Sequence, residues 1–198
     1  MKASKPKNRK CLTGKRGLIV VISAPSGCGK TTIVERLLKR NPGFWRSISA
    51  TTRPRRRGEK NRRDYYFLTR DEFFDIRKKG LFLEWAKVFG HYYGTPVEPL
   101  RQQIEKGKIA ILAVDVQGAG KLRKSLPLLS MFVLPPSLKD LKLRLAKRST
   151  DSKAEIEKRF RMARMEMREA HLYDYVVINR KISEIVEEIE NILKGAQE

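Results

Sequence analysis

The segment from Ala24 to Thr31 has residue types and a spacing suited to holding phosphate groups. It reads Ala24-Pro-Ser-Gly-Cys-Gly-Lys30-Thr31 and directly follows the apolar, β-branched run 18–23. Its glycines allow the backbone to wrap closely, so that amide groups point inward at phosphate oxygens, and a helix starting at Lys30 adds its positive end. The segment therefore predicts a site for a nucleotide phosphate chain.

This segment matches the P-loop motif with one departure, because the strict motif opens with glycine and this chain has Ala24. An ordinary glycine-rich turn is the alternative. The position between a buried strand and an amphipathic helix favours the P-loop. We expect Lys30 to bind the β and γ phosphates of ATP and the Thr31 hydroxyl to ligate Mg²⁺. The expected ATP-binding residues are Ala24, Pro25, Ser26, Gly27, Cys28, Gly29, Lys30, Thr31 and Thr32.

Strand and helix patterns alternate along most of the chain, which is typical of a parallel sheet covered by helices on both faces. The expected strands are 18–23, 47–50, 109–115, 131–134 and 175–178. The expected helices are 31–40, 97–106, 118–124, 138–148, 154–170 and 183–194. Between 51 and 96 the alternation gives way to short aromatic-rich strands and one helix, 71–79. The pattern predicts an α/β core with a small inserted subdomain.

Length and composition favour one folded domain with appendages, because 198 residues with 40% hydrophobic and 33% charged side chains are ordinary for a globular protein. Cys11 and Cys28 are too few for a disulfide framework and lack the spacing of a zinc site. We therefore expect a reducing, cytoplasmic location. The basic start 1–16 and the apolar run after it imitate a secretory signal, but that run leads straight into the glycine-rich loop, so we reject cleavage. We expect no membrane span.

The formal net charge is +22, from 44 basic and 22 acidic residues, and it predicts anionic partners. Solvated side chains account for most of these charges. The arginine-rich stretch 53–63 differs, because so many guanidinium groups repel one another unless an anion collects some of them. Nucleic-acid binding is the alternative function that this charge suggests, but no recognised RNA or DNA motif accompanies it, which disfavours a nucleic-acid partner.

Several separated motifs together resemble the guanylate kinase family, from the P-loop to the final helix. The matching residues are Ser49–Glu59, Asp64-Tyr65, Glu84-Trp85-Ala86, Tyr92–Thr95, Asp115–Gly118, Arg144, Arg148 and Arg159. The resemblance implies a P-loop nucleoside monophosphate kinase fold and a transferase of purine nucleotide metabolism. It implies transfer of the γ-phosphoryl group of ATP, bound with Mg²⁺, to GMP, and it leaves dGMP use and the oligomeric state open.

The resemblance also implies how the chain is divided. We expect a disordered basic tail at 1–16 and a guanylate kinase-like domain at 17–198. Within that domain we expect a core at 17–50 and 97–198, a GMP-binding insert at 51–96 and a mobile lid at about 144–160.

The resemblance implies that Arg53, Arg56, Tyr65 and Tyr93 hold the GMP phosphate. Guanidinium groups fork onto phosphate oxygens, and phenol hydroxyls donate single hydrogen bonds. Packing of the aromatic rings in a core is the alternative for the two tyrosines.

Four further residues are implied to contact the base, namely Ser49, Glu84, Thr95 and Asp115. Guanine presents N1 and N2 hydrogens to a carboxylate such as Glu84, whereas adenine reverses the polarity. Helix capping is the alternative role for Thr95 and for Asp115, because each is placed to cap a following helix.

The implied catalytic residues are Lys30, Arg144, Arg148 and Arg159. Phosphoryl transfer depends on alignment and electrostatic stabilisation, and the GMP phosphate is already ionised, so no catalytic base is needed. A solvated helix face is the alternative for Arg144 and Arg148.

Two positions depart from the family pattern. Ala113 stands where many relatives carry an acid, and Arg180 stands where an acid is common near the adenine pocket, so adenine contacts stay open. Guanylate-kinase-like scaffolding domains, a second functional class, lose phosphate-binding residues. Lys30, Arg53 and Tyr65 are all present here, which favours an enzyme.

Overall fold

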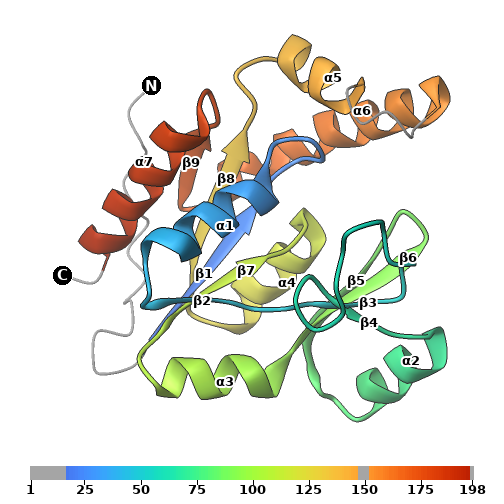
Figure 1. Ribbon diagram of the computed structural model, residues 1–198, viewed down its shortest axis with the longest axis vertical. Coiled ribbons are helices and arrows are strands. Elements are labelled where there is room, and N and C mark those ends of the chain that lie inside the picture. The colour runs from blue at the N-terminus through green and yellow to red at the C-terminus, as the bar shows by residue number, and fades with distance from the viewer. Residues whose placement is uncertain (1–16, 147–151, 197–198) are drawn as a thin grey trace.

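The computed structural model describes residues 17–146 and 152–196, and its core is a five-stranded parallel sheet in the order β2-β7-β1-β8-β9 (Figure 1). The strands are β1 (Leu18–Ser23), β2 (Phe44–Arg46), β7 (Ile109–Ala113), β8 (Leu129–Leu134) and β9 (Tyr175–Ile178). The expected α/β class with a parallel sheet flanked by helices is confirmed. The expected tail, 1–16, lies outside the described residues.

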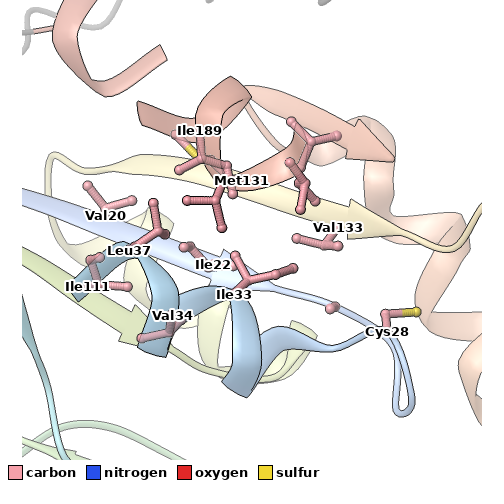
Figure 2. Packing of buried hydrophobic residues seen from close by; sticks show 14 of the residues in the cluster. Val20, Ile22, Cys28, Ile33, Val34, Leu37, Ile111, Met131, Val133 and Ile189 are labelled. Atoms are coloured by element: carbon pink, nitrogen blue, oxygen red, sulfur yellow. The ribbon is translucent and has the colours of Figure 1, made fainter. Parts of the chain in front are cut away.

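Helices cover both faces of this sheet because its central strands are apolar on both sides. Val20, Val21 and Ile22 of β1 are fully buried, as expected for a parallel strand between two helical layers. One face packs against α1 (Lys30–Arg40), α7 (Ile182–Gly195) and α6 (Lys153–Arg168), around the side chains of Figure 2. The other face packs against α3 (Val97–Glu105) and α4 (Val116–Ser125).

A second, four-stranded sheet is formed by residues 50–96, in the order β4-β3-β6-β5. Its strands are β3 (Ala50–Thr51), β4 (Tyr66–Phe67), β5 (Phe82–Val88) and β6 (His91–Pro96). Helix α2 (Arg70–Lys78) begins with a capping box between Thr69 and Glu72 and buries Phe73 against the rings of Phe82 and Tyr92. We call residues 51–96 the insert. In Figure 1 it lies at the lower right, while α5 (Leu138–Ala146) and α6 lie at the top.

The expected strand at 47–50 is wrong. The chain pairs with β7 earlier, through β2, and then crosses to the second sheet, where Ala50 begins β3. The expected helix at 118–124 begins two residues sooner, because Asp115 caps it by accepting a hydrogen bond from the Gly118 amide. The expected helix at 154–170 is α6 followed by a 3₁₀ turn, η1 (Glu169–Leu172). No helix within the described ranges is long and apolar enough to cross a membrane.

Candidate active site

The loop between β1 and α1 has the shape of a phosphate cradle. Gly27 and Gly29 have positive φ angles of 90° and 80°, a conformation that glycine adopts without strain. A Cβ atom at Gly27 would lie 3.1 Å from Leu145 of α5, and one at Gly29 would lie 3.0 Å from Asn179 Nδ2. Asn179 also donates to the Cys28 carbonyl at 2.9 Å, which ties the loop to the end of β9. The loop is therefore held by its neighbours, and a side chain at either glycine would be strained by the positive φ and would fit tightly.

The first turn of α1 carries groups that suit an anion. Its N-cap is Gly29, which offers no side-chain oxygen, so the first amides of the helix have no side-chain cap. Lys30 is half-buried, and its Nζ donates to the Val114 carbonyl at 2.9 Å beside the loop. Burial lowers the pKa of Lys30, while the charges of Asp115 and Glu166 oppose that effect. An incoming phosphate would gain both the helix amides and this ammonium group.

Carboxylates gather where the insert meets the core. The buried Glu84 of β5 accepts a hydrogen bond from the Thr95 hydroxyl at 2.7 Å. A Cβ atom at Gly118 would lie 2.8 Å from Glu84 Oε2 and 3.1 Å from Asp115 Oδ1, so the two carboxylates converge on the first turn of α4. Burial, helped by Asp115, raises the pKa of Glu84 to about 7, against the opposing effects of Thr95 and Lys121. These acceptors suit a ligand edge that presents hydrogen-bond donors.

Two tyrosines and an arginine form a cluster on the insert. The Arg53 guanidinium lies 5.4 Å from the centre of the Tyr65 ring, and the Tyr65 and Tyr93 rings meet edge to face at 6.0 Å. Glu59 pairs with Arg53 at 2.8 Å and also accepts from the Arg56 amide at 2.7 Å, so one carboxylate shapes the loop that carries both arginines. The sequence predicted that Arg53, Tyr65 and Tyr93 hold the phosphate of the nucleotide that accepts the phosphoryl group. We therefore call these three residues the acceptor cluster. The Arg56 side chain is exposed beside it.

The described part of the expected lid lies near both the P-loop and the insert. Leu145 of α5 is the neighbour that a Cβ atom at Gly27 would meet at 3.1 Å. Arg144 of α5 is half-buried and donates to the Asn179 carbonyl at 3.1 Å, so part of its guanidinium is held by the core. The Arg159 guanidinium of α6 lies 5.9 Å from the ring of Phe89, at the turn between β5 and β6. Arg148 lies outside the described residues. The described part of the lid thus touches both sides of the site.

Comparison with known proteins decides the family. The sequence model of the Guanylate kinase family matches residues 16–196. The chain belongs to the guanylate kinase family. It is 47% identical to a guanylate kinase of Wolbachia sp. subsp. Brugia malayi (strain TRS) over 89% of this chain and 92% of that protein. It is 43% identical to one of Clostridium tetani (strain Massachusetts / E88), over 91% and 87%.

A solved structure supports the same assignment. The crystal structure of guanylate kinase from Anaplasma phagocytophilum superposes with a TM-score of 0.79 at 34% identity, covering 93% of this chain and 88% of that one. This chain is therefore a guanylate kinase by family, and its fold is that of a solved member.

Among the residues expected to contact the base, Glu84, Thr95 and Asp115 lie together. The alternative role of Thr95 as a helix N-cap is wrong, because its hydroxyl donates to Glu84 and α3 begins after Pro96 without a side-chain cap. The alternative role of Asp115 as a helix N-cap is confirmed, since its side chain caps α4. Ser49 is half-buried in the connection into β3, where its carbonyl accepts from the Tyr66 amide at 2.9 Å.

Sequence reasoning missed Glu166 of α6, which lies beside the P-loop. Its carboxyl group accepts a hydrogen bond from the Ser26 amide, and burial raises its pKa to about 7. Arg159 precedes Glu166 by seven residues, so the two share one face of the helix. That spacing was the only sequence signal for Glu166, and it is common on helices.

Lys121 of α4 was missed as well. Its ammonium group donates to the Trp85 carbonyl and lies 4.7 Å from the centre of the Trp85 ring, while Arg77 of α2 lies 4.1 Å from the same ring. Trp85 is the neighbour of Glu84, so Lys121 holds the strand that carries Glu84 against the core, while Arg77 packs on the same ring from within the insert.

The residues at the start of α1 fit the magnesium ion that the family implies. Thr31 is exposed in the first turn, next to Lys30, so its hydroxyl is accessible to an ion that arrives with phosphates. No group of three acidic, histidine or cysteine residues within 17–146 and 152–196 forms a protein cage for a metal. This arrangement suits Mg²⁺ held mainly by substrate oxygens, which is how the ion commonly binds in kinases.

The raised pKa of Glu84 generates a prediction about stability. Its folded pKa of about 7 exceeds the ordinary glutamate value of 4.5, so between these values the folded protein binds more protons than the unfolded chain. Stability therefore falls as pH rises through this window, and burial of ionised Glu84 costs up to about 3 kcal/mol above it. Glu84→Gln removes that cost and keeps an acceptor for Thr95. We expect the melting temperature of the variant, relative to the unsubstituted protein, to be higher at pH 8 than at pH 5. An equal difference at both pH values would contradict a buried, protonatable Glu84.

Proposed function

We propose that this guanylate kinase transfers the γ-phosphoryl group of ATP to GMP and produces ADP and GDP. The observation that carries the proposal is the pairing of two anion-accepting regions. On the core side, the loop 24–31 leads into an uncapped helix with Lys30 in its first turn. On the insert side, the acceptor cluster places Arg53 beside two tyrosines, and the buried Glu84 lies with the half-buried Asp115 where the insert meets the core.

The donor nucleotide in this proposal binds through its phosphates. The backbone of residues 24–32 surrounds the β and γ phosphates, Lys30 neutralises them, and Thr31 ligates the Mg²⁺ bound with them. The magnesium ion supplies positive charge that screens the phosphate oxygens. Residue-level support comes from the left-handed glycines, which leave the loop amides free of side-chain obstruction.

The acceptor nucleotide in this proposal is held at both ends. Arg53, Arg56, Tyr65 and Tyr93 bind the phosphate, while Ser49, Glu84, Thr95 and Asp115 contact the guanine. Glu84 accepts from the N1 and N2 hydrogens when it is ionised, which an adenine edge could not satisfy. None of these residues is assigned to the ribose, so the proposal includes dGMP as a second acceptor.

The reaction step requires alignment rather than a protein base. An oxygen of the GMP phosphate forms a bond to the γ phosphorus as the bond from that phosphorus to the leaving ADP oxygen breaks. Lys30, Arg144, Arg148 and Arg159 stabilise the negative charge on the transferring group. The composition, with two cysteines in 198 residues, supports a cytoplasmic setting for this reaction.

A panel of acceptors tests the proposed function. The protein is incubated with ATP, Mg²⁺ and, separately, GMP, dGMP, AMP, CMP, UMP or dTMP, and ADP formation is followed. We expect turnover with GMP and dGMP and background rates with the others. A clear preference for any acceptor without guanine would refute the assignment, and absence of turnover with all six would refute the enzyme activity.

Lys30→Ala tests the donor side. The substitution removes the ammonium group from the phosphates and leaves the loop backbone in place, so we expect kcat to fall by about 100-fold or more with a nearly unchanged melting temperature. Lys39→Ala, on the exposed face of the same helix, is the matched control and should keep normal turnover. Similar rates for both variants would remove Lys30 from the reaction.

Glu84→Gln tests base recognition. The amide keeps one acceptor but replaces the other with a donor that faces a guanine donor, and an unpaired buried polar group costs about 1–3 kcal/mol. We expect kcat/KM for GMP to fall by about tenfold to a few hundredfold, with the KM for ATP unchanged. Steady-state kinetics with each substrate varied in turn provides the measurement. Normal GMP kinetics in the folded variant would exclude Glu84 from the base site.

A further inference from the structure

Arg46 is the last residue of β2, an outer strand of the core sheet. It therefore lies at the carboxyl ends of the strands, where β1 leads into the P-loop. It pairs in parallel register with Ile111 of β7, and β7 pairs with β1, which leads into the loop. Neighbouring strands lie about 4.8 Å apart, so the backbone of Arg46 is about 10 Å from β1. The carboxyl edge of an open parallel sheet is where ligands bind in such folds. Arg46 is therefore placed between the P-loop and the insert.

The guanidinium group of Arg46 is only partly satisfied by the protein. Its Nη2 donates to the Asp64 carbonyl of the insert at 3.3 Å. Its Nε is buried and has no hydrogen-bond partner among the residues that the structure describes. A buried N–H group on a charged side chain is costly without an acceptor. This orphan donor indicates an acceptor that comes from outside the chain.

Arg46 also faces other positive charge across the site. The pKa of Lys30 is lowered first by burial and then further by the charge of Arg46. The pKa of Tyr65 is raised by burial, and Arg46 and Arg53 both act against that rise. Arg46 is thus close enough to influence the P-loop lysine on one side and the acceptor cluster on the other. Arg53 is paired with Glu59, and Asp115 and Glu166 act on Lys30, whereas Arg46 has no ion pair with a carboxylate among the residues that the structure describes. An added anion would therefore be attracted most directly to Arg46.

The neighbouring face of the sheet does not neutralise this charge. Side chains alternate along a strand, so Ala113 follows Ile111 on the face of β7 that lies beside Arg46. Alanine offers no carboxylate there. Asp64 accepts a hydrogen bond from Arg46 at its backbone carbonyl, and the pKa of its carboxyl group is lowered, against the effect of burial, by the Lys60 amide, by Arg63 and by the charge of Arg46. That carboxylate is bonded to the Lys60 amide at 2.7 Å and to Arg63 at 2.8 Å, and in the described part of the chain it makes no ion pair with Arg46.

We propose that Arg46 is a further substrate-binding residue, whose Nε–H donates to the phosphate of GMP alongside Arg53 and Tyr65. This inference rests on the proposed function, because it takes the acceptor cluster as the phosphate site. The phosphate satisfies the orphan Nε donor and gives the Arg46 guanidinium an anionic partner. The guanidinium also reduces the repulsion between the GMP phosphate and the phosphates of ATP, since it lies on the side of the cluster that faces the P-loop.

Arg46→Met tests the proposal, because methionine keeps an unbranched side chain and loses both the charge and the Nε donor. We expect the KM for GMP to rise by about 10- to 100-fold, the range for loss of a charge-assisted hydrogen bond, with the KM for ATP changed less than about twofold. Inhibition by guanosine, which lacks the phosphate, should be unchanged. Arg57→Met is the matched control, because it removes an equal charge from an exposed position of the nearby basic loop, and we expect its KM for GMP to stay within about twofold of normal.

Arg46→Lys is a second, more conservative variant. It is needed because Arg46 also contacts Asp64, so that Arg46→Met could weaken GMP binding by destabilising the fold. Lysine keeps the charge but has no Nε–H, so we expect the KM for GMP to rise by about three- to tenfold with a normal melting temperature. The proposal is overturned if a folded Arg46→Met or Arg46→Lys variant keeps the normal KM for GMP, or if guanosine inhibition weakens as much as GMP binding. These outcomes are read against an unsubstituted protein that phosphorylates GMP. Absence of that turnover would instead refute the proposed function.

Discussion

The left-handed backbone at Gly27 and Gly29 is the constraint on which the rest of the site depends. Both glycines lie against other parts of the core, Gly27 against α5 and Gly29 against Asn179 at the end of β9. Asn179 holds the loop through the Cys28 carbonyl and, through its own carbonyl, holds Arg144. One residue, Asn179, therefore holds both the glycine-rich loop, through its side chain, and Arg144, through its backbone carbonyl. The packing of Figure 2, in which Cys28 lies at the edge of the apolar cluster, extends this constraint into the core.

The insert is joined to that rigid core where the carboxylates meet. Glu84 approaches the first turn of α4 so closely that a Cβ atom at Gly118 would lie 2.8 Å from its Oε2, and Lys121 of the same helix holds the Trp85 carbonyl and ring. Asp115 belongs to this junction in two ways, since it caps α4 and supports the raised pKa of Glu84. A helix of the core thereby positions a residue of the insert. In the proposed reaction, this contact couples base recognition to the P-loop, because Val114, the neighbour of Asp115, accepts from Lys30.

Local patterns predicted the parts of this molecule that depend on contiguous residues. The P-loop could be found from its glycines, Lys30 and the flanking strand and helix, and α/β alternation indicated the parallel sheet. The strand expected at 47–50 failed because apolar pattern alone does not show where a chain leaves one sheet for another. Arg46, Lys121 and Glu166 were missed for a related reason. Each is a single charged residue in a chain with 44 basic and 22 acidic side chains, and only tertiary packing distinguishes it from solvated neighbours.

The same packing gives the ligand-free site an electrostatic cost that its substrates can relieve. Lys30 has a pKa lowered by burial, while Glu84 and Glu166 have pKa values raised to about 7 for the same reason. Burial of each charged form is unfavourable without a partner, and the orphan Nε of Arg46 adds an unsatisfied donor. Phosphates would pair with the cations, and guanine donors would pair with the Glu84 carboxylate. The fold already holds these groups in position before the proposed substrates bind. Binding energy is therefore gained without reorganising the site, which is electrostatic preorganisation.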